Sequence, residues 1–299
     1  MPSVESVYDS AVAGQATGLR RMRMPRPVRV IAVTSGKGGV GKTSVSVNLA
    51  VAMAMDGRRV MILDGDLGLA KVDVMLGLQP SLNLSHVLAG QCSLDDTILE
   101  GPAGVMVVPA ASGQRSMAEL SPAEHAGLVR AFSELQRPLD TLIVDTAAGI
   151  ADSVITFSQA SQEVIVVITN DPQSLTDAYA LIKVLSRDYG VARVQVLANQ
   201  VHNVREAREI FDSLQRVCER FLDVGLTPIG AIPQDEWLRR AVRRQRAVVD
   251  AYPSAPSAVA FRQLAALTAA WTAPEGPRGN LEFFVERLIT REPVLGVGT

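Results

Sequence analysis

The chain has 299 residues, of which 47% are hydrophobic and only 4% are aromatic. Its length suffices for one large domain with extensions or for two small domains, and the aliphatic bias suits buried parallel strands covered by helices. The formal net charge of −2 gives no general attraction to nucleic acid or to an anionic membrane, so any such binding needs a local patch. The two cysteines, Cys92 and Cys218, provide neither a disulfide framework nor a CxxC metal pair.

No segment is typical of a secretory signal or of a membrane span. The first residues are rich in arginine but lack an apolar run, and apolar runs elsewhere, such as Val164–Ile168, are too short to cross a bilayer. We therefore expect a cytoplasmic protein.

Three regions are expected along the chain. Residues 1–27 contain scattered Gly and Pro and predict a flexible arm. Residues 28–272 alternate short β-branched runs with helical stretches such as Thr43–Met55 and Leu175–Asp188, and residues 273–299 predict a linker and an amphipathic helix. The alternation predicts an α/β fold with a doubly wound, mostly parallel sheet flanked by helices. The predicted strands are Val28–Thr34, Val60–Leu63, Val105–Pro109, Thr141–Val144, Val164–Thr169, Val194–Leu197 and Thr227–Ile232.

The stretch from Ser35 to Ser44 reads Ser-Gly-Lys-Gly-Gly-Val-Gly-Lys-Thr-Ser and lies between the first predicted strand and a predicted helix. This context is typical of a phosphate-binding loop, in which glycines let backbone N–H groups close around a phosphate chain. Lys42 places a charge at the β- and γ-phosphates, Thr43 offers a hydroxyl to Mg²⁺, and Ser44 is placed to bind the α-phosphate. The expected nucleotide-binding residues of the loop are Gly36, Lys37, Gly38, Gly39, Val40, Gly41, Lys42, Thr43 and Ser44.

A second lysine, Lys37, lies inside the same loop, five positions before Lys42. With it the loop resembles the deviant Walker-A loop of the MinD/ParA family of ATPases. The resemblance implies a slow, Mg²⁺-dependent ATP hydrolase that forms a homodimer with ATP, in which Lys37 reaches the nucleotide of the partner copy. A triphosphate carries more negative charge than one lysine and one Mg²⁺ neutralise, which favours this role over a solvated loop lysine.

Acidic residues follow two of the predicted strands, at the sheet edge where ligands bind in open α/β folds. Asp145 resembles the Walker-B carboxylate that holds the Mg²⁺ shell, and Gly149 offers a backbone N–H to the γ-phosphate. By the same resemblance, Asp66 orients the attacking water or accepts its proton, and Asp64 lies behind it near the metal. Thr43, Asp64, Asp66 and Asp145 are thus the predicted metal site, and Lys37, Lys42 and Asp66 the predicted catalytic residues.

Two further segments resemble the adenine site of the family. Asn199 ends a predicted strand, and an Asn amide pairs with N6 and N7 of adenine. Pro233 and Asp235 belong to a segment similar to the one that closes over the base from the other side. The chain departs from the family's flagellar members at Lys71, where they usually have an asparagine after the switch aspartate.

The two ends of the chain resemble a subgroup of the family, the flagellar-number regulators FlhG/FleN (also called YlxH). Gln15, Leu19 and Arg20 match the N-terminal motif by which these proteins stimulate the GTPase FlhF. The tail carries apolar side chains at helical spacing, which predicts either a reversible membrane contact at the inner face of the cell membrane or docking on the protein's own surface. The expected membrane residues are Leu281, Phe284, Val285 and Leu288.

The resemblance implies an ATP-dependent switch that regulates flagellar number through an FlhF-like GTPase and a FleQ-like transcriptional activator. A ParA-type DNA-partitioning ATPase, a MinD-type regulator of the division site and a nucleotide-locked binding module remain alternatives. Iron–sulfur carriers of the family need a CxxC pair and do not fit. The arginine-rich stretch 238–246 lacks interleaved aromatic residues and predicts a solvated helix face, so we expect no specific nucleic-acid binding.

Overall fold

The computed structural model describes residues 28–66, 71–110, 127, 130–135 and 137–271. Within them an eight-stranded sheet has the order β3-β4-β2-β5-β1-β6-β7-β8. All neighbouring strands are parallel except β3 and β4. The strands are β1 (Arg29–Ser35), β2 (Val60–Gly65), β3 (Leu99–Glu100), β4 (Met106–Val108), β5 (Thr141–Ala148), β6 (Glu163–Ile168), β7 (Arg193–Val201) and β8 (Gly225–Pro233).

Alternate side chains of each strand enter hydrophobic layers on opposite faces of the sheet. In β1, Ile31 and Val33 belong to one layer and Val30 to the other. Both faces are apolar, so the strands read as nearly continuous runs of Val, Ile, Leu and Ala, as expected for a parallel sheet covered on both sides. This pattern explains why the strands are visible in the sequence.

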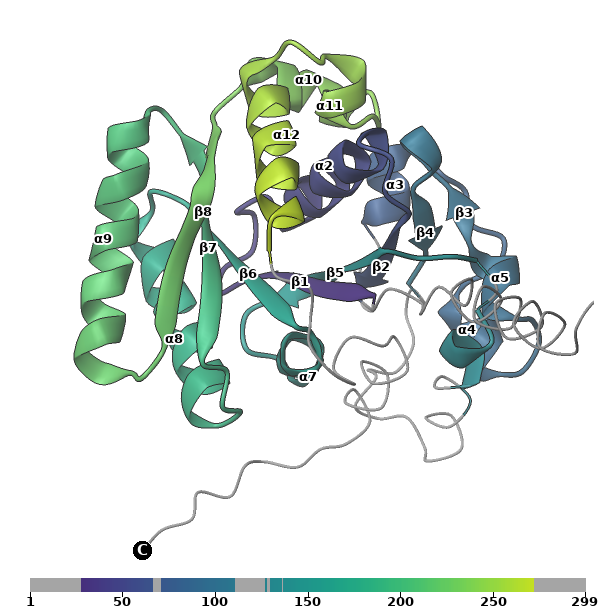
Figure 1. Ribbon diagram of the computed structural model, residues 1–299, viewed down its shortest axis with the longest axis horizontal. Helices are drawn as coiled ribbons and strands as arrows, with labels where there is room; N and C mark the ends of the chain where they lie inside the picture. Colours follow the sequence, from purple (N-terminus) through teal and green to yellow (C-terminus); the bar gives the residue numbers. More distant parts are fainter. Residues whose placement is uncertain (1–27, 67–70, 111–126, 128–129, 136, 272–299) are drawn as a thin grey trace, which may run out of the picture.

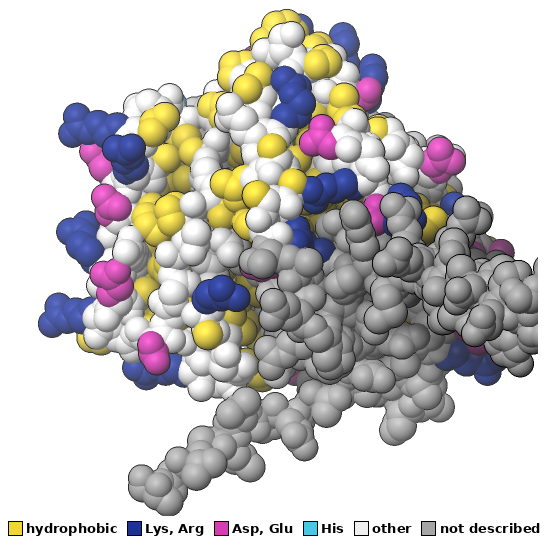
Figure 2. All heavy atoms as spheres, viewed as in Figure 1, with side chains coloured by type: hydrophobic (Ala, Val, Ile, Leu, Met, Phe, Trp, Pro, Cys, Tyr) yellow, Lys and Arg dark blue, Asp and Glu magenta, His cyan; other side chains and the backbone are white. Residues whose placement is uncertain are grey.

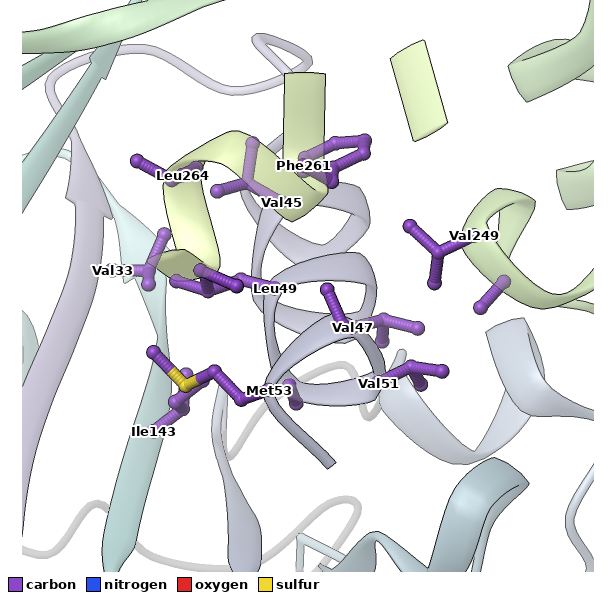
Figure 3. Close-up of a cluster of buried hydrophobic side chains, with 14 of the residues drawn as sticks. Val33, Val45, Val47, Leu49, Val51, Met53, Ile143, Val249, Phe261 and Leu264 are labelled. Carbon is purple, nitrogen blue, oxygen red and sulfur yellow. The ribbon is translucent and has the colours of Figure 1, made fainter. Parts of the chain in front are cut away.

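Helix α2 (Lys42–Met55) lies at the centre of one face, between the sheet and α12 (Pro256–Ala269). Figure 3 shows Leu49 of α2 among the side chains of Val33, Ile143 and Phe261. Because α2 is covered on both sides, it is buried around most of its circumference and its amino end is held firmly at the sheet edge. The remaining elements of this face are α3 (Val72–Leu76), α10 (Glu236–Arg243) and α11 (Val248–Ala251), with the short 3-10 helix Pro102–Gly104 near the start of β4.

Among the described residues, helices α4, α5, α7, α8 and α9 and the helical residues 130–133 contribute to the core of the opposite face, and α7 is seen there below the sheet in Figure 1. Helix α9 has a narrow buried side, formed by Ile210, Leu214 and Cys218, and most of its other residues are charged or polar. In Figure 2 acidic and basic side chains follow the left edge of the molecule, where α9 lies. The helices of this face are α4 (Leu84–Leu88), α5 (Leu94–Thr97), α7 (Asp152–Ala160), α8 (Pro172–Arg187) and α9 (Val204–Phe221).

The predicted α/β sheet is confirmed, and each of the seven predicted strands corresponds to an observed one. Two of the differences from the prediction have identifiable reasons. Helix α8 begins three residues earlier than predicted, because the carboxylate of Asp171 accepts a hydrogen bond from the N–H of Gln173 and caps the helix. The edge strand β3 has only two residues and gave no periodic signal.

The predicted arm (1–27) and tail (273–299) lie outside the described residues, and with them the expected partner residues and membrane residues at the two ends. None of the helices among the described residues is long and apolar enough to cross a membrane. The division of the chain into three regions and the roles of the two ends therefore stay predictions.

The packing of α12 on α2 predicts a large loss of stability when Phe261 is truncated. Its side chain is fully buried, so we expect Phe261→Ala to lower the free energy of unfolding by about 3–5 kcal/mol. Leu267 lies on the same helix and is 40% exposed, so Leu267→Ala serves as control and should cost less than about 1 kcal/mol. Urea denaturation of the two variants measures the difference, and equal losses would contradict the packing described for α12.

Candidate nucleotide site

The phosphate loop, residues 36–41, joins β1 directly to α2. Gly41 has φ = 92°, and a Cβ atom there would lie 2.4 Å from Nδ2 of Asn199. Gly36 packs so closely on α8 that a Cβ atom would lie 2.0 Å from the carbonyl carbon of Asp177. At Gly38 and Gly39, by contrast, a Cβ atom would meet nothing within 4 Å. The loop is therefore braced at its two ends and open between them, which leaves room for phosphate oxygens.

Lys42 begins α2, and its side chain is largely buried beneath the loop. Its Nζ donates to Oγ of Ser35 at 3.0 Å, and this hydroxyl donates in turn to the carbonyl of Lys37 at 2.7 Å. Burial lowers the pKa of Lys42, while the negative charge of Asp145 acts in the opposite direction. The ammonium group thus lies where the sequence predicts the phosphate-binding charge.

Asp145 lies near the end of β5 and is fully buried. Oγ1 of Thr43 donates to its Oδ2 at 2.7 Å, and Oγ of Ser46 donates to its Oδ1 at 2.7 Å. Burial raises the pKa of Asp145, and the two hydroxyl donors and Lys42 act against this rise. The carboxylate therefore joins the first turn of α2 to the sheet, and the structure brings Thr43 and Asp145 together as predicted.

Asp64 lies in β2 beside Asp145, its register partner in β5. It is 1% exposed, and burial together with the charge of Asp145 raises its pKa to about 7. Its Oδ2 accepts from the backbone N–H groups of Lys71 at 2.8 Å and Val72 at 3.1 Å, and its Oδ1 accepts from the N–H of Asp66 at 3.1 Å. Asp64 thus holds together the two sides of the segment that follows β2.

The carboxylate of Asp66 forms an ion pair with the ammonium group of Lys71. The side chain of Asp66 is 13% exposed, whereas that of Lys71 is 48% exposed. Asp66, the predicted switch carboxylate, is therefore paired with a lysine of its own chain.

Lys37 does not turn toward Lys42 but forms an ion pair with Asp171, the N-cap residue of α8. Both side chains are partly exposed, at 31% and 40%, and this pair together with the N–H of Gln173 lowers the pKa of Asp171. The ammonium group of Lys37 thus lies at the protein surface beside the phosphate loop.

The other predicted nucleotide contacts have hydrogen-bond partners within the chain. Asn199 is buried and braces the loop, because its Nδ2 donates to the carbonyl of Val40 at 2.7 Å. The N–H of Gly149 donates to the carbonyl of Ser35 at 2.9 Å. Their contacts with nucleotide stay predictions.

The segment predicted to cover the adenine lies at the junction of β8 and α10. Pro233 ends β8, and Asp235 caps α10 by accepting from the N–H of Trp237 at 2.9 Å. The second oxygen of Asp235 accepts from the N–H and Oγ of Ser257 at 3.0 and 2.6 Å. Asp235 thus joins α10 to α12, and its contact with the base likewise stays a prediction.

The side chains at this site fit a magnesium–nucleotide complex. Oγ of Ser44 is buried without a hydrogen-bond partner, at the position predicted for an α-phosphate contact. Among the described residues no group of three or more His, Cys, Asp or Glu side chains is arranged to hold a metal ion. Mg²⁺ keeps much of its hydration in phosphate sites, so Thr43 and Asp145, together with water and phosphate oxygens, suit it better than an all-protein cage.

Three residues of the site were missing from the sequence prediction: Ser35, Ser46 and Asp171. Ser46 lies three positions after Thr43, and residues at this spacing share a helix face, so its contact with the same carboxylate was accessible to pattern reasoning. Asp171 follows β6 at the sheet edge that carries the other strand-end carboxylates. The role of Ser35, the residue just before the loop, had no signal in the sequence.

A parallel sheet, a phosphate loop with an unpartnered hydroxyl and buried strand-end carboxylates define a P-loop nucleotide-binding protein. Residues 27–268 match the family model ParA, described as NUBPL iron-transfer P-loop NTPase. The chain belongs to the ParA/MinD family of P-loop NTPases. The predicted enzyme class, a P-loop ATPase with ATP and Mg²⁺ as its ligands, is confirmed at the level of the family.

Two relatives belong to the flagellar branch of the family. The chain is 55% identical to the Antiactivator FleN of Pseudomonas aeruginosa over 278 residues, which is 93% of this chain and 99% of that protein. It is 34% identical to the Flagellum site-determining protein YlxH of Helicobacter pylori over 265 residues, 87% of this chain and 90% of that protein. The predicted FlhG/FleN subgroup is thereby confirmed.

Solved structures of MinD proteins support the fold and the family. The septum site-determining protein MinD of Pyrococcus horikoshii, solved in complex with Mg-ADP, is 29% identical and superposes with a TM-score of 0.65, covering 81% of this chain and 96% of that one. The cell division ATPase MinD of Pyrococcus furiosus is 27% identical, with a TM-score of 0.66 and coverage of 81% and 98%.

The close contact of Gly41 with Asn199 predicts that the loop tolerates no side chain at this position. Gly41→Ala should weaken ATP binding at least about tenfold, because the new Cβ atom displaces the loop from its brace. Gly57 also has a positive φ, of 82°, but open space around it, so Gly57→Ala is the matched control. We expect it to cost about 1–2 kcal/mol of stability and to leave binding unchanged. Titration with a fluorescent ATP analogue separates the two, and equal affinities would contradict the brace.

Proposed function

We propose that this protein is an ATP-driven switch that dimerises on ATP, hydrolyses it slowly and in the dimeric state controls flagellar number through partner proteins. The observation that carries this proposal is the position of Lys37, a second loop lysine whose ammonium group lies at the surface instead of in its own phosphate site. The identity to FleN and YlxH over nearly the whole chain supports the flagellar process.

Within one copy, the phosphate loop would hold the triphosphate, with Lys42 at the β- and γ-phosphates and the hydroxyl of Ser44 at the α-phosphate. Thr43 and Asp145 would hold the Mg²⁺ shell, and Mg²⁺ would supply neutralisation of the negative charge on the phosphate oxygens. Asp66 would orient the attacking water. Asp64, behind it, would shape the segment that carries Asp66.

Lys37 would be donated to the nucleotide of a second copy. Its pair with Asp171 involves two partly exposed side chains, and such a pair is screened by water and contributes little to stability. A triphosphate has a larger and more concentrated negative charge than one carboxylate, so exchange of Asp171 for the partner's triphosphate is favourable. ATP would in this way link phosphate binding to dimerisation.

The partners we propose are an FlhF-type GTPase, contacted through Gln15, Leu19 and Arg20, and a FleQ-type transcriptional activator. Support comes from the name of the FleN relative, which describes an antiactivator, and from the complex of MinC with MinD of Aquifex aeolicus, a protein of the same fold. We further propose that the apolar tail gives the dimer a reversible contact with the inner face of the cell membrane. An iron-transfer role is disfavoured, because Cys92 and Cys218 belong to separate hydrophobic clusters and form no CxxC pair.

Removal of the Lys37 ammonium group should abolish ATP-dependent dimerisation. We expect Lys37→Ala to stay monomeric with Mg-ATP and to lose most hydrolysis, because the charge supplied across the interface is missing. Lys183 is exposed on α8, so Lys183→Ala is a control that should dimerise like the unmodified protein. Light scattering after size-exclusion chromatography and phosphate release measure both properties. Normal dimerisation and turnover of Lys37→Ala would contradict the proposal.

The two hydroxyl donors of Asp145 should differ in their effect on Mg²⁺. We expect Thr43→Ala to raise the Mg²⁺ concentration needed for half-maximal ATP binding, because this hydroxyl is the proposed metal ligand. Ser46→Ala also removes a donor to Asp145 and should cost about 1–3 kcal/mol of stability while leaving the Mg²⁺ requirement unchanged. Mg²⁺ titrations and urea denaturation check both parts, and an equal shift in the two variants would refute the metal role of Thr43.

A further inference from the structure

The chain contains only four lysines, and three of them, Lys37, Lys42 and Lys71, lie at the nucleotide site. The other basic residues are arginines apart from Lys183 on α8. Lys37 belongs to the phosphate loop and Lys42 directly follows it, but Lys71 lies beyond β2, at the N-cap of α3. Phosphate binding by the loop therefore does not explain this lysine, whose ammonium group is a more compact charge than the guanidinium group of arginine.

The ammonium group of Lys71 contacts the site through Asp66, with which it forms an ion pair. Its charge also reaches deeper into the pocket, where it adds to the lowering of the pKa of Lys42 by burial and opposes the rise that burial causes in the pKa of Asp145. The side chain of Lys71 thus pairs with one group of the site and acts electrostatically on others. Lys71 is part of the charge balance around the phosphates and not a solvated residue of the surrounding surface.

We propose that Lys71 is a positioning residue that acts as a brake on ATP hydrolysis, by binding the carboxylate of Asp66 and withholding it from the attacking water. This inference rests on the proposed role of Asp66. In hydrolysis the water oxygen bonds to the γ-phosphorus, the bond from that phosphorus to the β–γ bridging oxygen breaks, and ADP leaves with the bonding electrons. The proton lost by the water goes to the carboxylate of Asp66.

An ammonium group bound to Asp66 opposes this step in two ways. It occupies an oxygen that would otherwise accept a hydrogen bond from the water, and it holds the carboxylate in place beside Lys71, away from the position from which Asp66 would take the proton. Because the pair is partly exposed, it is weak enough to exchange with water, so the brake slows turnover without abolishing it. Slow hydrolysis suits a switch whose dimer must persist long enough to act on its partners.

The side chain of Lys71 can be changed without removing the local anchor of the chain. Asp64 is held by the backbone N–H groups of Lys71 and Val72, and these remain after any substitution except proline. The ammonium group itself contributes little to stability, because its side chain is 48% exposed. An effect on turnover is thereby separable from an effect on folding.

The test is steady-state phosphate release by the full chain with Mg-ATP, compared among Lys71→Asn, Lys71→Gln and Lys71→Arg. We expect Asn and Gln to raise kcat by about three- to sixfold with KM unchanged, which is the scale of releasing a partly exposed ion pair. Lys71→Arg keeps the charge and should retain the original kcat. Lys183→Asn removes a lysine far from the site and is the matched control; thermal melting verifies that all variants fold.

Several results would overturn the brake. They are an unchanged or lower kcat in both neutral variants, an increase in Lys71→Arg equal to that in Lys71→Asn, or acceleration by Lys71→Asn that persists in an Asp66→Asn background. The proposed function is tested separately by Asp66→Asn alone, which should reduce hydrolysis to background. If Asp66→Asn has that effect and Lys71→Asn does not raise kcat, the brake is wrong while the role of Asp66 stands.

Discussion

Asp64 and Asp145 are register partners on adjacent parallel strands, and both carboxylates are buried at the same edge of the sheet. Two buried like charges repel each other and lose their hydration, so the arrangement persists only where donors and cations surround it. Hydroxyl groups of α2 bind Asp145, and backbone N–H groups of the segment after β2 bind Asp64. The phosphate loop, the segment after β2 and the ammonium group of Lys42 are therefore placed where they compensate these two acids.

The sheet and its helices provide the rigidity that this acid pair requires. Strand order places β5 between β1 and β2, so the phosphate loop after β1 and the acidic segment after β2 lie on either side of Asp145. Helix α2 is fixed on one side by the sheet and on the other by α12, and the side chain of Asn48 in α2 accepts hydrogen bonds from the N–H groups of Val248 and Val249 at 2.7 and 3.4 Å. A site built on such elements keeps its geometry.

Pattern reasoning identified the loop and the strand-end acids because both depend only on local order: a β-branched run, then glycines or an aspartate, then a helix. It could not assign partners across the fold. The sequence predicts base contacts for Asn199 and Asp235, which stay predictions, but it did not indicate that Asn199 also braces the loop or that Asp235 joins α10 to α12. The role of Ser35 was hidden for the same reason, because it depends on where the ammonium group of Lys42 comes to lie.

Each of the three site lysines contacts an oxygen of the chain itself: Lys42 that of Ser35, Lys37 that of Asp171 and Lys71 that of Asp66. One of these oxygens belongs to a neutral hydroxyl and two belong to carboxylates. This difference would decide the order in which the lysines exchange them for phosphate. A neutral hydroxyl is easily replaced by a phosphate oxygen, so Lys42 would respond to any nucleotide, whereas the two carboxylates compete electrostatically with a phosphate. Lys37 would leave Asp171 only for the triphosphate of a second copy. Lys71 would leave Asp66 only when the negative charge near that carboxylate changes. The same acids that stabilise the resting site would thus set the sequence in which nucleotide binding, dimerisation and hydrolysis take place.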